Sequence, residues 1–264
     1  MDGLPMCLPA GLTILVLGLL GARTEVAALE VRVTRDSYDA GGRRINIEHF
    51  EPADAAAKGA AVVLHGAGGT IFDGPEMRRV ARALAENGYD VSLLHYFDRT
   101  GTLFARDRTM QQNFALWLET VCKGIEHVRV TRSQGRPVYV YGYSLGGFLA
   151  IAAASENRDV AAVAEHAGGI WNNQKERIGR MPPVLMIHGA VDRRVPFDKY
   201  ARPLLAKLRR GKGGVVTHFY AHEDHVFMPP ALRDVRREVE QFFDAHRRAQ
   251  ARVESPAAMS HVRR

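Results

Sequence analysis

The chain has 264 residues, 46% hydrophobic and 25% charged, which suits one large globular domain with an ample core. Its net charge of +7 is spread along the sequence rather than gathered in a stripe, and no nucleic-acid recognition motif accompanies it. The composition therefore argues against nucleic-acid binding.

The first predicted element is an apolar run over residues 12–20, followed by small residues at 26–28. This order is typical of a secretory signal, and the run is short for a membrane span. We expect residues 1–28 to be a cleaved signal peptide of a secreted or periplasmic protein with no stable membrane insertion. An uncleaved anchor is the alternative, because Asp2 stands in a segment that is usually basic. Cleavage would leave Cys122 alone, without an intrachain disulfide partner.

A buried strand is predicted next, at the start of residues 60–69, and it ends in the sequence His-Gly-Ala-Gly-Gly. Glycines at this point let the backbone approach a ligand closely. Acyl transfer needs two backbone N–H groups to stabilise an oxyanion, and we expect Ala67 to supply one of them. A phosphate-binding loop is disfavoured because no Lys-Ser/Thr pair follows the glycines.

Helical and strand-like runs then alternate along the chain. Helices are predicted over residues 74–86 and 106–131, and strands over residues 90–95 and 160–164. Such alternation predicts an α/β fold with a mostly parallel, doubly wound sheet and helices on both faces.

The most informative motif is Gly-x-Ser-x-Gly, centred on Ser144 between a β-prone run (residues 138–141) and a small-residue helix (residues 148–155). In a sharp strand-to-helix turn the serine backbone is strained, so its neighbours must lack bulk. Gly142 and Gly146 meet this requirement because they have no side chain. The motif predicts an exposed nucleophile, with Leu145 as the second oxyanion donor. A glycine-rich turn with an ordinary serine is the alternative.

A serine hydroxyl needs a histidine as base and a carboxylate to orient that histidine. The apolar run at residues 183–189 predicts a buried strand, and Asp192 lies in the loop that follows it. Asp192 is therefore the expected acid, and a solvated turn aspartate is the alternative. Asp198 is its nearest rival, but it falls in the first turn of the next predicted helix.

The histidine is expected after one more strand, predicted over residues 215–220. Both His222 and His225 lie in the following loop, before the last helix. His225 is the predicted base, since it is deeper in the loop and is followed by apolar residues. A metal site over residues 222–225 is the other interpretation, but the spacing matches no HExxH pattern.

Five further side chains are candidates for the substrate pocket. Glu165 and His166 close a strand at the edge where ligands bind in this class of sheet, or they are simply loop residues. Tyr96, Trp171 and Phe227 form an apolar wall in this hypothesis, or they are core packing.

The predicted site is framed by a single catalytic domain at residues 29–248 and a basic, disordered tail at residues 249–264. Few residues separate the strand at 160–164 from the strand at 183–189. A large cap domain is therefore not expected.

Four segments together resemble the α/β-hydrolase superfamily and, within it, the dienelactone-hydrolase-like branch. The segments are His65-Gly-Ala-Gly-Gly69, Gly142-Tyr-Ser-Leu-Gly-Gly147, His188-Gly-Ala-Val-Asp192 with Val195-Pro196, and the loop residue His225. The resemblance implies a Ser-His-Asp triad without cofactor or metal. One residue departs from the pattern, because dienelactone hydrolases proper use a cysteine where this chain has Ser144.

The sequence thus predicts an exported serine hydrolase that cleaves a small carboxylic ester through an acyl-enzyme. A peptidase or amidase of the same fold, and a catalytically degenerate binding protein, are the alternatives. Physiological substrate and oligomeric state stay open.

Overall fold

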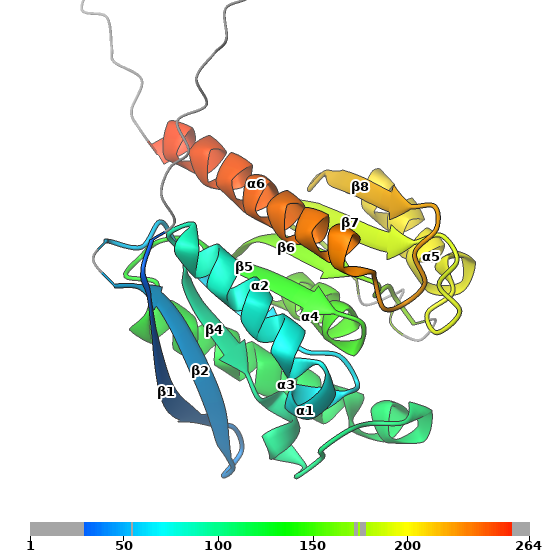
Figure 1. Ribbon diagram of the computed structural model, residues 1–264, viewed down its shortest axis with the longest axis horizontal. Coiled ribbons are helices and arrows are strands. Elements are labelled where there is room, and N and C mark those ends of the chain that lie inside the picture. Colours follow the sequence, from blue (N-terminus) through cyan, green and yellow to red (C-terminus); the bar gives the residue numbers. More distant parts are fainter. Residues whose placement is uncertain (1–28, 54, 172–173, 175–177, 255–264) are drawn as a thin grey trace, which may run out of the picture.

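Residues 29–53, 55–171, 174 and 178–254 are described by a computed structural model of the chain (Figure 1). Within this part, eight strands form one sheet in the order β1-β2-β4-β3-β5-β6-β7-β8. The strands β1 and β2 are antiparallel to their neighbours, and all later pairs are parallel. The strands are β1 (Val31–Asp39), β2 (Arg44–Pro52), β3 (Ala60–Leu64), β4 (Asp90–Leu94), β5 (Val138–Tyr143), β6 (Val160–His166), β7 (Val184–Gly189) and β8 (Val215–Tyr220).

Helices cover both faces of the sheet, as the alternation predicted. The helices α2 and α6 pack on one face, and α3, α4 and α5 pack on the other, each through its own hydrophobic cluster. The helical segments are α1 (Gly69–Phe72), α2 (Gly74–Glu86), the short 3₁₀ helix η1 (Tyr96–Arg99), α3 (Asp107–Thr131), α4 (Leu145–Glu156), α5 (Phe197–Arg210) and α6 (Pro229–Glu254). The fold is therefore a doubly wound α/β sheet, as expected.

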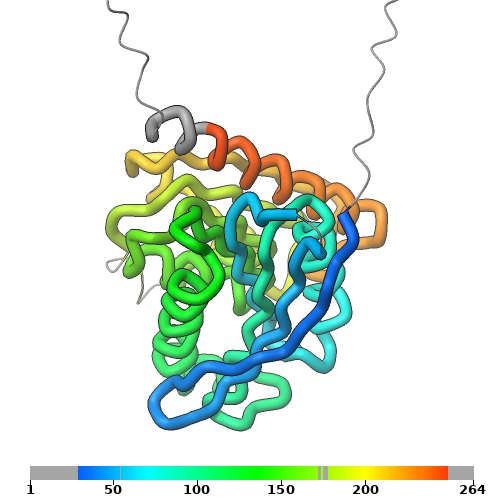
Figure 2. Tube along the Cα trace, turned by 90° about the vertical axis from the view of Figure 1, so that its left-hand side faces the viewer, coloured from blue at the N-terminus to red at the C-terminus, as the bar shows by residue number. Residues whose placement is uncertain are grey.

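The parallel strands follow the predicted ones to within a few residues, because each is rich in apolar residues and all but β8 are largely buried. The hairpin of β1 and β2 was not predicted. It lies at the near edge of the sheet in Figure 2, and most of the β1 side chains are exposed. The β1 sequence is largely polar and solvent-facing, so it lacks the apolar signal that marks the central strands.

The helix α6 continues past residue 248, the predicted boundary between domain and tail, to Glu254. Ala, Gln, Arg and Glu dominate residues 249–254, and all favour helix. Ser255 precedes Pro256, and a residue before proline is disfavoured in helical conformation. The remaining tail (residues 255–264) and the predicted signal (residues 1–28) lie outside the described residues.

The chain between β6 and β7 comprises only residues 167–183, so no large cap domain is inserted there. Among the described helices, none is long and apolar enough to cross a membrane. Because β3 to β8 are parallel, their carboxyl ends meet at one edge of the sheet, and the loops at this edge carry all the predicted catalytic residues.

Candidate active site

Ser144 occupies a tight turn between β5 and α4. Its backbone has φ 53° and ψ −120°, a combination that a residue with a side chain adopts only under strain. Two hydrogen bonds hold the turn: the Ser144 N–H donates to the His166 carbonyl, and the Ser144 carbonyl accepts from the Gly147 N–H, each at 2.8 Å. The serine hydroxyl is thereby presented at the carboxyl edge of the sheet.

The two glycines of the motif are required by close packing. A Cβ atom on Gly142 would overlap the backbone of Gly146, and one on Gly146 would overlap the carbonyl of Leu64. Gly142 therefore allows the turn to close on itself, and Gly146 allows it to pack against the end of β3.

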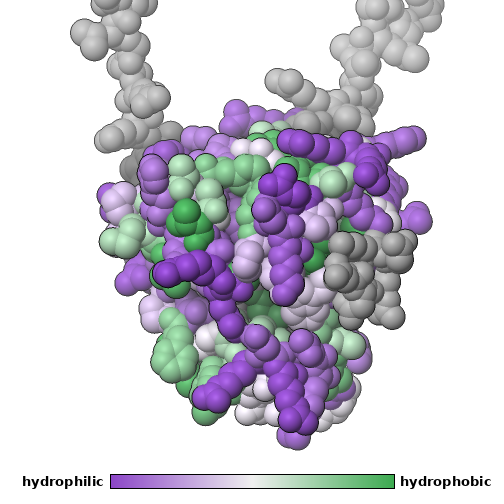
Figure 3. All heavy atoms as spheres, turned by 90° about the vertical axis from the view of Figure 1, so that its right-hand side faces the viewer, coloured by the Kyte–Doolittle hydropathy of each residue, from purple (hydrophilic) through white to green (hydrophobic). Residues whose placement is uncertain are grey.

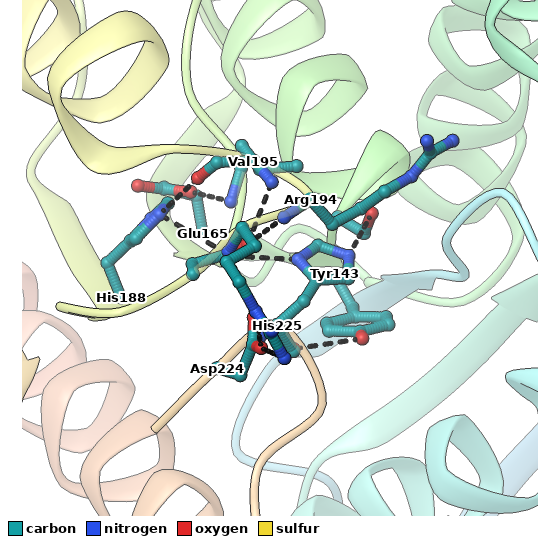
Figure 4. Close-up of polar contacts among 11 residues, drawn as sticks. Tyr143, Glu165, His188, Arg194, Val195, Asp224 and His225 are labelled. Atoms are coloured by element: carbon teal, nitrogen blue, oxygen red, sulfur yellow. Dashed lines mark hydrogen bonds and ion pairs between the residues drawn. The ribbon is translucent and has the colours of Figure 1, made fainter. Parts of the chain in front are cut away.

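The structure brings together the three residues that the sequence singled out (Figure 4). The His225 Nε2 atom lies 2.9 Å from the Ser144 Oγ atom, and the His225 Nδ1 atom lies 2.8 Å from the Asp192 Oδ2 atom. Asp198, the rival acid, lies in the first turn of α5 and pairs with Arg202. His222 is exposed on the same loop as His225.

Asp192 is enclosed by its own loop. Its Oδ1 atom accepts the N–H groups of Arg194 at 2.9 Å and Val195 at 2.7 Å, which leaves Oδ2 to His225. The buried His188 supports this loop by donating from Nε2 to the Val195 carbonyl at 2.8 Å. Burial lowers the pKa of His188, although Val195 and Asp192 act in the opposite direction. A neutral His188 does not compete with His225 for the charge of Asp192.

His225 is fixed through its backbone as well as its ring. The Tyr143 hydroxyl donates to the His225 carbonyl at 3.1 Å, and the His225 N–H donates to the Asp224 Oδ1 atom at 2.8 Å. Asp224 is itself paired with the Arg193 guanidinium. Tyr143 is half-buried and links the serine turn to the histidine loop.

The loop after β3 packs directly against the serine turn. A Cβ atom on Gly66 would lie 3.0 Å from the Ser144 Cβ atom, so the two backbones are in close approach. Among the described residues, neither the Ala67 N–H nor the Leu145 N–H donates a hydrogen bond. Both are free to receive a substrate oxygen.

Asp73 holds this loop from the side, and the sequence analysis did not single it out. Its Oδ2 atom accepts the Gly68 N–H at 2.9 Å, and the Gly66 N–H also stabilises the carboxylate. Burial raises the pKa of Asp73, although these N–H groups and His225 act in the opposite direction. Its position before Gly74 and Pro75 predicts a helix N-cap, but the side chain makes no capping bond to α2.

The three residues of the predicted apolar wall do not lie in one cluster. Tyr96 belongs to the cluster that contains α3 and α4, and Trp171 packs against the same cluster, whereas Phe227 belongs to the cluster on the opposite face of the sheet. Tyr96 is fully buried and donates from its hydroxyl to the His65 carbonyl at 2.7 Å. The predicted apolar wall is therefore wrong, because the sheet separates its members.

Glu165 and His166 are buried beneath the site. The Glu165 Oε2 atom accepts the Gly168 N–H at 2.9 Å, and burial raises the pKa of this carboxyl to about 8. His166 contacts the Tyr141 hydroxyl at 3.0 Å through Nδ1, and burial lowers its pKa to about 3. Both residues support the strand ends from within the core rather than from an open pocket.

The metal interpretation of residues 222–225 finds no support in the described part of the chain. There, no group of three or more His, Cys, Asp or Glu side chains is arranged to hold a metal ion. His225 instead faces Ser144 and Asp192.

Comparison with known proteins points to one family. The sequence profile of the dienelactone hydrolase family matches residues 45–255. No curated protein matches the chain.

Solved structures share the fold. They include a dienelactone hydrolase from Anabaena variabilis (20% identity, TM-score 0.64, covering 81% of this chain and 98% of that one). A dienelactone hydrolase-like promiscuous phosphotriesterase from metagenomic libraries has 17% identity and a TM-score of 0.70, with 81% and 98% covered. A cold-adapted esterase from an Arctic intertidal metagenomic library has 14% identity and a TM-score of 0.65, with 82% and 94% covered. At these identities the likeness establishes the fold alone.

Proposed function

The chain belongs to the dienelactone hydrolase family, and on that premise we propose that it is a serine hydrolase that cleaves a carboxylic ester through an acyl-enzyme. The observation that supports this proposal is the unbroken chain of contacts from Ser144 through His225 to Asp192. These contacts join three loops at one edge of the sheet and match the order of a nucleophile, a base and an orienting acid.

In the proposed mechanism the Ser144 Oγ atom attacks the ester carbonyl while His225 Nε2 takes the hydroxyl proton. Asp192 accepts the Nδ1–H of His225, which selects the tautomer that leaves Nε2 free to act as base. The imidazolium then returns its proton to the leaving alkoxide as the C–O bond breaks. Water, activated by the same histidine, hydrolyses the acyl-enzyme and restores the serine.

The oxyanion of each tetrahedral intermediate is proposed to bind the N–H groups of Ala67 and Leu145. Support comes from the close approach of the Gly66 segment to Ser144 and from the absence of an acceptor for either N–H among the described residues. Loss of one such donor typically costs about 10²–10³-fold in kcat.

Export is also part of the proposal. It rests on the apolar run and the small residues that follow it within residues 1–28. Mass analysis of protein recovered outside the cytoplasm should give a chain that begins at residue 29, and an intact Met1 would contradict export by a cleaved signal.

A serine-directed fluorophosphonate probe tests the function. We expect the probe to label Ser144 in the parental protein and to leave Ser144→Ala unlabelled. On p-nitrophenyl acetate, kcat should fall by about 10⁴-fold or more in the variant, with an unchanged thermal midpoint. Near-parental turnover by folded Ser144→Ala would refute the serine mechanism, and a matched panel of esters and amides separates esterase from amidase.

A further inference from the structure

Exposed large apolar side chains gather at the edge of the sheet that carries Ser144. Eleven such residues are exposed in the described part of the chain, and seven of them lie in the connections that follow the carboxyl ends of the strands. We call these seven the apolar rim: Ile71, Phe72, Leu103, Phe104, Val191, Val226 and Met228. Single exposed apolar residues are ordinary on a protein surface, but such a concentration around one site is not.

The rim lies on both flanks of the candidate active site. Four of its residues follow β3 and β4, and the other three follow β7 and β8. In the sheet order, β5 with Ser144 lies between these two pairs of strands. The first flank is continuous across two loops, since the rings of Phe72 and Phe104 are in edge contact with centroids 6.2 Å apart.

Figure 3 views the molecule from the side toward which the arrows of β7 and β8 point in Figure 1. Apolar side chains, in green, stand apart from one another around this face, and long hydrophilic side chains, in purple, lie among them. If the substrate were a small ester bound at Ser144, the apolar side chains around this face would stay exposed to water. An extended apolar surface would cover both flanks at once.

Charge on the same loops suits such a surface. The exposed charged side chains of these loops and of the first turns of α3 and α5 are mainly cationic, with Arg106, Arg108, Arg193, Arg194 and Lys199 against Asp107 and Asp198. Arg194 pairs with Asp107 at 2.8 Å, Asp198 with Arg202 at 2.6 Å, and Arg193 with Asp224 at 2.7 Å. Ester hydrolysis at an interface releases carboxylates, which would give the surface the opposite charge.

We infer that the apolar rim seats the active-site mouth on the surface of an aggregated, water-insoluble ester. This inference rests on the proposed function and names its substrate class: esters that are presented as droplets or micelles. Binding at the rim places Ser144 over the interface, so that an ester group can reach it without first dissolving in water.

The test compares soluble and emulsified substrate. With tributyrin, the rate of the parental protein should rise at least tenfold as the ester concentration passes its solubility limit. The double variant Leu103→Ser/Met228→Ser removes one rim residue from each flank and should lose most of that rise. Its turnover of soluble p-nitrophenyl acetate should stay within about twofold of parental, because both side chains are exposed and neither belongs to the proposed triad.

The chain offers a matched control. Leu103, Met228 and Val130 are each 64% exposed, but Val130 lies near the C-terminal end of α3, away from the rim. Val130→Ser should therefore behave like the parental protein on both substrates. Equal effects of the control and the double variant, or no rise in rate beyond the solubility limit, would overturn the inference.

Two further outcomes are separable. If the parental protein does not turn over soluble ester either, the proposed function fails. In that case, co-sedimentation of Ser144→Ala with tributyrin droplets, with and without the two rim substitutions, tests binding at the rim independently of catalysis. If sedimentation equilibrium shows a dimer that the double variant dissociates, the rim is a self-association surface and the inference is wrong.

Discussion

At the scale of single residues, the two oxygen atoms of the Asp192 carboxylate have different hydrogen-bond partners. Two backbone N–H groups occupy Oδ1, and His225 occupies Oδ2. In Asp192→Asn the amide nitrogen would face the His225 Nδ1 atom and favour the wrong tautomer. We expect kcat on p-nitrophenyl acetate to fall by about 10⁴-fold while the fold is kept.

The two histidines of the same loop provide the control for that experiment. His225→Ala should cost about as much as loss of the serine, because members of a triad act as a unit. His222→Ala should stay within a few fold of parental kcat, since His222 is exposed. A large loss in His222→Ala would overturn the assignment of the base.

Asp73 gives a second prediction at this scale. Its carboxylate holds Gly66 and Gly68, which flank the proposed oxyanion donor Ala67. Asp73→Ala should lower kcat about tenfold or more with little change in KM, because the donor is needed mainly in the transition state. Asp73→Asn keeps an acceptor oxygen and should restore most of kcat. Equal losses in both variants would show that the acceptor is not what matters.

At the scale of elements, the strand–turn–helix unit of β5 and α4 depends on contact with β3. A Cβ atom on Gly146 would overlap the carbonyls of Leu64 and His65, both rigid backbone atoms. Gly146→Ala should therefore push α4 away from β3 and separate the two proposed oxyanion donors. We expect kcat to fall at least tenfold and stability to fall by about 1–3 kcal/mol, measured by urea unfolding.

Gly179→Ala is the matched control, because a Cβ atom there would meet no atom of the described residues within 4 Å. It should change neither kcat nor stability appreciably. If Gly146→Ala were equally silent, the close packing of the serine turn would not matter for catalysis.

The elements also show what sequence patterns can predict. The strands β3, β5 and β7 are fully or almost fully buried, so each is a continuous apolar run closed by glycine or a polar residue. The strand β1 is mostly exposed and carries Arg32, Arg35 and Asp36, so its sequence resembles a loop. It is a strand because it pairs with β2 along its whole length, which is a tertiary effect.

At the scale of the whole molecule, chain order predicted which residues meet, but not what surrounds them. Ser144, Asp192 and His225 could be chosen because each follows a predicted parallel strand, and parallel strands end at one edge. His188 and Asp73 support the site differently, through hydrogen bonds to the Val195 carbonyl and to the Gly68 N–H, respectively. No local sequence pattern predicts such contacts. The position of Asp73 just before α2 is typical of a helix N-cap, although its side chain makes no capping bond.

The predicted pocket wall is wrong for the same reason, because it depends on packing that no local sequence pattern predicts. Trp171 and Phe227 both follow strand ends, and the sequence does not tell on which face of the sheet each will pack. That depends on the path of each loop over the edge. Site residues that lie on strand ends are therefore predictable, whereas side chains that depend on loop paths are not.

Glu165 leads to a prediction about the stability of the whole molecule. It is fully buried, its Oε1 atom has no partner among the described residues, and burial raises its pKa from 4.5 to about 8, although the Gly168 N–H opposes this. Between these two pH values the folded protein holds a proton that the unfolded chain has lost. The free energy of unfolding contributed by Glu165 therefore falls as pH rises through this window, by at most about 1.4 kcal/mol per pH unit, and levels off above it.

Glu165→Gln should remove this contribution, because the amide keeps an acceptor for Gly168 but does not ionise. We expect the variant to gain stability relative to the parental protein as pH rises from 4.5 to 8, in urea unfolding at a series of pH values. Glu240, whose pKa burial raises to about 7, provides a control. In a Glu240→Gln background the gain from Glu165→Gln should persist. A difference between parental protein and Glu165→Gln that stays constant with pH would mean that Glu165 is already ionised in the fold, with an unseen partner at Oε1.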